Sequence, residues 1–180
     1  MAKIAVLLVI AFGTTQAQQA NHVGGASMAF TLTSPAFAAG AEIPPQYTCK
    51  GADISPALEW SGAPAHTVSF ALIMDDPDAP AGTWVHWVVW NMPASVHSLP
   101  AGVPKHERLS DGTQQGRNSF RKTGYGGPCP PGGATHRYFF RLYALDSKLN
   151  LAAGADRAQL DEAMQGHVLA QTEYMGTFHK

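Results

Sequence analysis

The sequence predicts a mainly β fold in a single domain, on the strength of three observations. The segments 67–74, 84–92 and 136–145 are rich in β-branched and aromatic residues, the composition typical of β-strands. The stretches between them are rich in glycine and proline, which interrupt regular structure. Setting aside an N-terminal leader leaves about 150–160 residues, a length that suits one domain with a sizeable core.

The strands are expected in the following order along the chain. Residues 28–33 (MAFTLT) alternate in polarity, which predicts an edge or half-buried strand. Residues 67–74 (TVSFALIM) and 84–92 (WVHWVVWNM) are apolar almost throughout, which predicts central strands covered on both faces. Residues 136–145 (HRYFFRLYAL) predict a third long strand, in which two arginines break the apolar run.

The remaining segments predict loops, one helix and a last strand. Residues 34–56 carry four prolines and are expected to hold little regular structure. Residues 110–133 predict a long irregular loop, which is usually functional inside a compact domain. Residues 154–166 (GADRAQLDEAMQG) predict an amphipathic helix with Asp156 as its N-cap. The later part of 167–178 predicts the final strand.

The N-terminus has the pattern of an export signal. Lys3 precedes the apolar run 4–12, and small residues suited to signal peptidase follow it. The run is shorter than the roughly 20 residues of a membrane-spanning helix, and no other segment is apolar enough to span a membrane. We therefore expect a removable signal peptide at 1–17, a flexible tail at 18–27, one domain at 28–180, and a secreted or periplasmic protein.

Charge and cysteine content narrow the possible partners. The chain has 12 basic and 13 acidic residues, a formal net charge of −1, and no basic run, which argues against nucleic-acid binding. Its two cysteines, Cys49 and Cys129, form no CxxC motif that would favour zinc. In an oxidising compartment one disulfide is expected, the alternative being two buried free thiols.

Two groups of residues have the chemistry of a binding site. Asp75, Asp76 and Asp78 crowd one turn, and such close carboxylates repel one another unless a cation or donor faces them. His86 lies in the next apolar strand and is a candidate partner, although a lone buried histidine is more often structural. The segment 122–138 (KTGYGGPCPPGGATHRY) predicts a stiff loop whose glycines let N–H groups approach an anion. Neither a Walker loop nor GxGxxG is present.

Several ordered motifs resemble one known family. They are DDPDAP, GTWVHWVVWNMP, NSF, KTGYGGPCPP, HRYFFRLYALD and GHVLAQTEYMGTF. From about Phe30 to the C-terminus the chain resembles the phosphatidylethanolamine-binding protein (PEBP) family, in particular its bacterial Raf-kinase-inhibitor-like branch. The resemblance implies a β-sandwich with a few short peripheral helices, and a small non-catalytic anion pocket without a cofactor. The implied ligand is phosphate or a phospholipid head group.

The resemblance also implies which residues form the pocket. By motif match these are Asp76, Asp78, His86, Gly126, Pro130, Pro131, His136 and Tyr138. His136 and Tyr138 are two apart in a strand, so their side chains leave the same face. We expect the aspartates to orient the imidazoles and raise their pKa, so that a cationic histidine faces the ligand. Arg121 stands where related bacterial sequences commonly have glycine. Its side chain is expected to point into solvent, the alternative being a phosphate-directed fork.

Three other functions account for parts of the sequence. Two histidines and a carboxylate can ligate a metal, but no HExxH spacing is present. Ser110 and Ser119 lie near Asp111 in the sequence, yet no GxSxG elbow marks a hydrolase. The resemblance also allows a protein-interaction inhibitor, directed at a serine protease or another envelope or host protein. Neither the ligand's identity nor the oligomeric state follows from the sequence.

Overall fold

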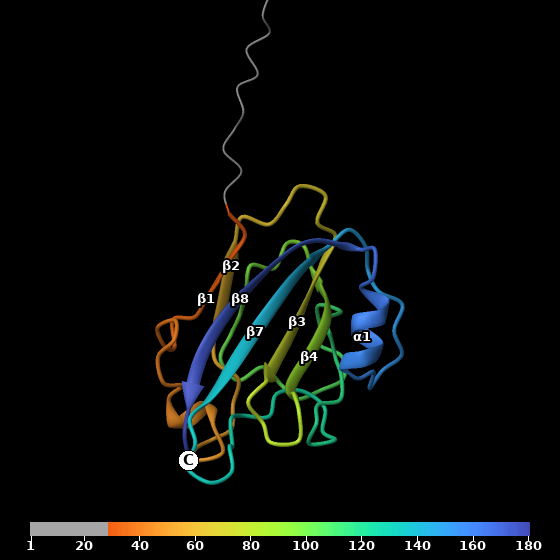
Figure 1. Cartoon of the computed structure of the whole chain (residues 1–180). Helices are drawn as coiled ribbons and strands as arrows, with labels where there is room; N and C mark the ends of the chain where they lie inside the picture. The colour runs from red at the N-terminus through yellow and green to blue at the C-terminus, as the bar shows by residue number, and fades with distance from the viewer. Residues whose placement is uncertain (1–28) are drawn as a thin grey trace, which may run out of the picture.

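The computed structural model describes residues 29–180 and contains two antiparallel sheets (Figure 1). Its elements are β1 (Thr31–Thr33), a 3-10 turn (Pro45–Tyr47), β2 (Leu58–Ser61), β3 (Ser69–Asp76), β4 (Trp84–Pro93), β5 (Ser98–Leu99), β6 (Gln114–Gln115), β7 (His136–Leu145), α1 (Arg157–Ala163) and β8 (Val168–Phe178). The expected signal peptide and tail lie outside the described residues.

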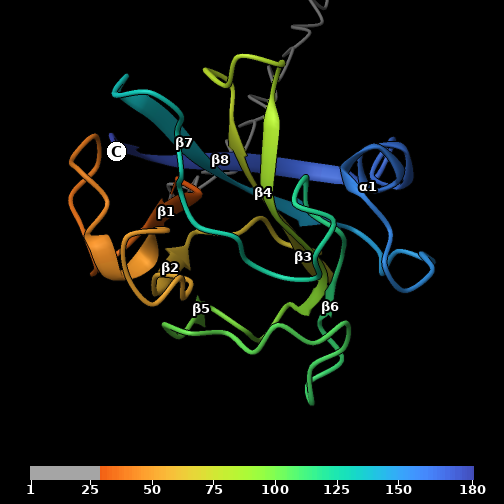
Figure 2. The same ribbon diagram turned by 90° about the horizontal axis from the view of Figure 1, so that it is seen from below.

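The two sheets form a sandwich around the main core. The larger sheet has the strand order β6-β4-β3-β7-β8, and the smaller has the order β1-β2-β5. Figure 2, seen from below, shows β1, β2 and β5 gathered to one side of the larger sheet. Leu58 and Trp60 from the smaller sheet pack with Leu72, Phe140 and other residues of the larger one. The predicted mainly β sandwich is therefore confirmed.

The larger sheet is covered on both faces, as the apolar runs of β3 and β4 predict. Every residue of β3 is buried. On the face of β3 that points away from the main core, Ala71 and Ile73 join a second core. This second core also contains Leu160 from α1 and Met164, which directly follows the helix. A strand buried on both faces needs no polar alternation, which is why these two segments read as continuous apolar runs.

The helix begins and ends close to where the sequence places it. Asp156 caps α1, accepting a hydrogen bond from the amide of Gln159, whose side chain in turn accepts from the amide of Asp156. Gly166, with a φ of 78°, separates the helix from β8. The last strand begins earlier than expected, at Val168. Within residues 29–180, no helix is long and apolar enough to cross a membrane.

The shortest strands escape prediction because too few residues carry their pattern. β5 and β6 have two residues each, and β6 lies inside the segment expected to be a loop. Its pairing with Val89 and Trp90 of β4 is a long-range contact that no local pattern can reveal.

Candidate functional site

A β-bulge in β4 brings His86 to the site. Met74 pairs with Trp87, but the next residue, Asp75, pairs with Val85, so His86 is an extra residue opposite them. Such a bulge re-aims side chains at sites. Here Trp87 enters the main core, and His86, instead of pointing to the opposite face, lines a pocket at the end of the strand.

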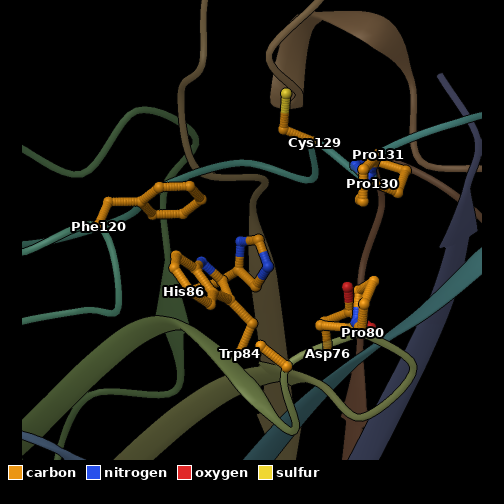
Figure 3. A pocket seen from close by; sticks show the side chains of 10 residues that line it. Asp76, Pro80, Trp84, His86, Phe120, Cys129, Pro130 and Pro131 are labelled. Carbon is orange, nitrogen blue, oxygen red and sulfur yellow. The ribbon is translucent and has the colours of Figure 1, made fainter.

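The pocket has a volume of about 310 Å³, which is in the range of small-molecule sites. Figure 3 shows His86 and Trp84 at its base, with Phe120 and the loop Cys129–Pro131 above them. It is lined by Asp76, Ala79, Pro80, Ala81, Trp84, His86, Phe120, Cys129, Pro130 and Pro131. Most of these side chains are apolar, so the few polar groups among them decide what binds.

Asp76 holds His136 beside the pocket. The carboxylate oxygen Oδ2 lies 2.8 Å from His136 Nδ1, and both side chains are only 5% exposed. Because a carboxylate only accepts, Nδ1 carries the proton. The other oxygen, Oδ1, accepts the Asp78 amide at 2.9 Å, which fixes the carboxylate. The expected orientation of an imidazole by an aspartate is thus observed for this pair.

His86 is held differently from what was expected. Its Nδ1 lies 2.6 Å from the carbonyl oxygen of Gly126, so the ring donates to backbone and not to a carboxylate. Burial lowers the pKa of His86, although the Gly126 carbonyl and the Asp76 charge oppose that effect. The folded protein therefore favours the neutral ring, in which Nε2 is an acceptor. An aspartate was expected to hold one of the two histidines as a cationic donor, and His86 is not held in that way.

Asp78 does not face the pocket. Its carboxylate makes a bidentate pair with Arg137, at 2.7 and 2.9 Å, and also accepts the Arg137 amide. The guanidinium hydrogen bonds lower the pKa of Asp78 to about 2. Asp78 acts as a brace between the turn after β3 and the start of β7. Within residues 29–180, no three His, Cys, Asp or Glu side chains are grouped to hold a metal ion.

Two buried donors at the site have no hydrogen-bond partner among the described residues. They are the Tyr138 hydroxyl and the indole N–H of Trp84. The Tyr138 ring makes an edge contact with His86, with the ring centroids 5.2 Å apart. Burial, followed by the Asp76 charge and a side-chain contact with Asp76, raises the pKa of Tyr138, so its hydroxyl keeps its proton. The contact with Asp76 does not have the geometry of a hydrogen bond. An unpaired buried donor is costly, and such groups often mark a site that a ligand completes.

The glycines of the pocket loop have a packing role. The Gly126 amide donates to the His86 carbonyl, and the Gly127 amide donates to Asp53 Oδ1. A Cβ on Gly127 would lie 2.5 Å from the Tyr47 carbonyl oxygen, so only glycine fits there. These two amides are engaged inside the protein, which contradicts the expectation that they form an open anion nest.

The expected disulfide between Cys49 and Cys129 is present, with the Cα atoms 5.4 Å apart. Cys129 lines the pocket directly before Pro130. The Cys49 amide also donates to the Pro128 carbonyl, at 3.1 Å. The bond thus ties the pocket loop to the segment that contains the 3-10 turn.

Four of the residues predicted for the site, Asp76, His86, Pro130 and Pro131, line this pocket. His136 and Tyr138 contact the lining residues Asp76 and His86, and a role of any of them in ligand binding stays a prediction. Phe120 was missed, although it is 38% exposed and makes edge contacts with both Trp84 and His86. Its only sequence signal is a large apolar residue inside a polar loop. Arg121 lies away from this pocket, in a separate groove.

The lowered pKa of His86 predicts acid-sensitive stability. The unfolded ring has a pKa of about 6.5, so stability from the neutral folded ring is present above that pH and lost as the pH falls below it. In His86→Asn, the side-chain amide can still donate to Gly126. We expect the free energy of unfolding of this variant to fall less between pH 7 and 5 than that of the wild type, as measured by urea denaturation. The exposed His97→Asn variant is the control, and equal pH slopes in His86→Asn and wild type would contradict the assignment.

Comparisons with known proteins agree on one family. The sequence profile of the phosphatidylethanolamine-binding protein family matches residues 33–179. A UPF0098 protein of Methanothermobacter thermautotrophicus is 49% identical over 83% of this chain and 98% of its own length. A UPF0098 protein of Aquifex aeolicus is 47% identical over 87% of this chain and 91% of its own.

Two crystal structures share the fold. One is the PEBP homologue CT736 of Chlamydia trachomatis, with a TM-score of 0.78 and 42% identity, and the other is YbcL of E. coli, with a TM-score of 0.78 and 34% identity. Each comparison covers 84% of this chain and 98% of the other. With its fold and its sequence in agreement, the chain belongs to the phosphatidylethanolamine-binding protein family.

Proposed function

We propose that this protein binds a small anionic ligand, phosphate or a phosphorylated head group, in the pocket beside His86 and His136, and that it does so without turnover. The observation that carries the proposal is the unpartnered Tyr138 hydroxyl, buried beside His86 and close to the Asp76–His136 pair. A ligand oxygen that accepts from Tyr138 would supply the missing hydrogen bond.

The two histidines offer complementary groups to such a ligand. Because Asp76 accepts from Nδ1 of His136, Nε2 is the ring atom left for a ligand, and we propose that it donates a charge-assisted hydrogen bond to the anion in the complex. Neutral His86 offers Nε2 as an acceptor, which suits the O–H of a singly protonated phosphate or an ammonium group. The apolar wall of Pro80, Trp84 and Phe120 suits the carbon atoms of a head group.

The surroundings of the pocket support binding over hydrolysis. Ser119, the serine closest in sequence to Phe120, accepts the Val85 amide with its hydroxyl and lines a different groove. Catalysis by a serine needs a base within hydrogen-bond reach, and the hydrogen bonds of the two histidines go to Asp76 and Gly126. We also propose that the protein is exported, for which the N-terminal leader pattern and the Cys49–Cys129 disulfide are the support.

Calorimetric titration with inorganic phosphate and with phosphoethanolamine tests the binding proposal. We expect His136→Ala to weaken binding of either probe by about tenfold or more, which corresponds to about 1.4 kcal/mol. His167→Ala is the matched control, because His167 Nδ1 also lies 2.8 Å from an aspartate, Asp146, but at the exposed surface. The control is expected to bind as the wild type does. Wild-type affinity in His136→Ala would refute the proposed site.

A further inference from the structure

A second groove, distinct from the histidine pocket, is lined by three arginines. Arg117, Arg121 and Arg157 border an open hollow of about 340 Å³, together with Ser119 and Asp156. The groove and the pocket lie on either side of the segment that contains Ser119 and Phe120. Ser119 lines the groove, whereas its neighbour Phe120 lines the pocket. The volume is within the range of small-molecule sites.

Two of these arginines have no acidic partner. Arg137 pairs with Asp78, and Arg141 pairs with Asp75 and Glu173. In contrast, no carboxylate among residues 29–180 lies within 4.0 Å of Arg117 or Arg121. Residues 1–28 contain no aspartate or glutamate that could neutralise them. Two guanidinium groups of the groove are therefore free of a direct ion pair among the described residues.

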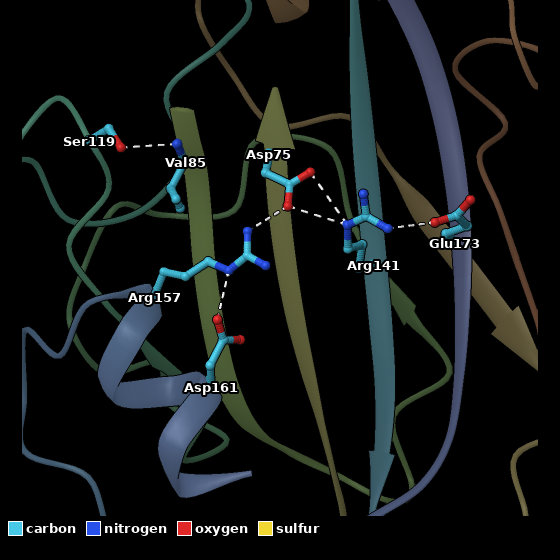
Figure 4. A network of polar contacts seen from close by, with 7 residues as sticks. All are labelled: Asp75, Val85, Ser119, Arg141, Arg157, Asp161 and Glu173. Carbon is cyan, nitrogen blue, oxygen red and sulfur yellow. Dashed lines mark hydrogen bonds and ion pairs between the residues drawn. The ribbon is translucent and has the colours of Figure 1, made fainter. Parts of the chain in front are cut away.

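Of the other charged groups that line the groove, Arg157 is paired with carboxylates, whereas Asp156 adds one negative charge. Arg157 donates to Asp75 with Nη1 and to Asp161 with Nε, and Figure 4 shows this network beside the Ser119–Val85 contact. Asp156 uses one carboxylate oxygen to cap α1, by accepting the Gln159 amide. The hydroxyl of Ser119 accepts the Val85 amide at 2.9 Å, which leaves its own proton to donate to a ligand.

The backbone of Arg121 is held in an unusual conformation. Its φ is 60°, in the left-handed region where residues other than glycine are uncommon. The side-chain oxygen of Asn118 accepts the Phe120 and Lys122 amides, at 3.0 and 3.1 Å, and the Arg121 amide donates to the Asn118 carbonyl. These hydrogen bonds hold the turn that places Arg121 at the groove.

We propose that this groove binds the phosphate group of a small molecule, with Arg117, Arg121 and the Ser119 hydroxyl as donors. Each guanidinium can donate two parallel N–H bonds to phosphate oxygens. The groove and the histidine pocket share no lining residue, so the two sites are distinct. Arg121 then acts as a phosphate-directed fork, the alternative to the solvent-facing side chain expected from the sequence.

Titration with inorganic phosphate, followed by amide NMR signals at constant ionic strength, tests the second site. In the wild type we expect the signals of Ser119, Arg121 and Ala158 to shift and saturate, with a dissociation constant separate from that reported by Tyr138. Arg117→Gln/Arg121→Gln is expected to raise the groove's dissociation constant by about tenfold or more and to leave that of the pocket within about twofold. His136→Ala is expected to do the reverse.

The control for lost charge is Arg108→Gln/Lys148→Gln, which removes two exposed positive charges that line neither cavity and is expected to leave binding at the groove unchanged. Arg121→Gly guards against a folding defect, because glycine suits a φ of 60°. It is expected to keep or raise stability while weakening binding at the groove.

Repeating the titration with glycerol phosphate distinguishes a phosphate ester from the free ion, since tighter binding of the ester identifies it as the ligand class. Groove signals that move equally with sodium chloride, or that do not respond to the arginine variants, would overturn the proposal.

Discussion

Replacing both Cys49 and Cys129 by serine is expected to lower the free energy of unfolding by about 4 kcal/mol. The disulfide joins residues 80 positions apart, and closing a loop of that length in the unfolded chain contributes about 4–5 kcal/mol in the chain-entropy treatment. Such a loss is a large fraction of the 5–15 kcal/mol typical of a domain. Urea denaturation of the variant and of the oxidised and reduced wild type measures it.

The same change is expected to weaken phosphate binding, because Cys129 lines the pocket directly before Pro130. Without the bond, the loop is held at this point by the Cys49 amide and the Pro128 carbonyl. Reduced wild type should match the serine variant, and dithiothreitol should leave the serine variant unchanged. If reduction lowers the stability of the wild type by less than about 1 kcal/mol, the bond contributes far less than the loop length implies.

Local sequence pattern was enough to predict the long strands and the helix of this fold. The segments of β3 and β4 are apolar because α1 and the smaller sheet cover both faces of the larger sheet. Asp156 and Gln159 form a capping box that depends only on residues close in sequence. The pairing of β6 with β4 depends on contacts distant in sequence, so no local pattern indicates it.

The site was predictable as a set of residues but not as a hydrogen-bond network. Asp76 and Asp78 were both predicted for the pocket, and Asp75 belongs to the same turn, but which of the three contacts His136, 60 residues from Asp76, does not follow from the sequence. The alternation of β3 decides against Asp75, which faces α1 and binds Arg141 and Arg157. Asp78 does not pair with His136 because its carboxylate is bound by Arg137, the next residue along β7. The bulge at His86 is an irregularity in the pairing of β3 with β4, so the sequence of neither strand alone indicates it.

Successive side chains of β7 point to opposite faces of the sheet. This predicts the second large effect, a difference in the stability lost when each of two adjacent phenylalanines is replaced. Phe140 is fully buried in the main core, opposite Tyr174 on β8, and its ring centroid lies 6.2 Å from that of Phe37. Removing a buried aromatic ring loses its transfer free energy and leaves a cavity. We expect Phe140→Ala to lower the free energy of unfolding by about 3–5 kcal/mol.

Phe139 is the matched control, because it differs from Phe140 in the face of the strand that it occupies. It is half-buried, and its ring lies under the guanidinium groups of Arg137 and Arg141, with the Arg141 group 4.8 Å from the centroid. Its loss removes these cation–π contacts and partial burial, for an expected decrease of about 1–2 kcal/mol. Urea denaturation of the two alanine variants measures the difference. Equal losses would mean that β7 does not separate a buried face from an exposed one, and the placement of Tyr138 behind the pocket depends on that same separation.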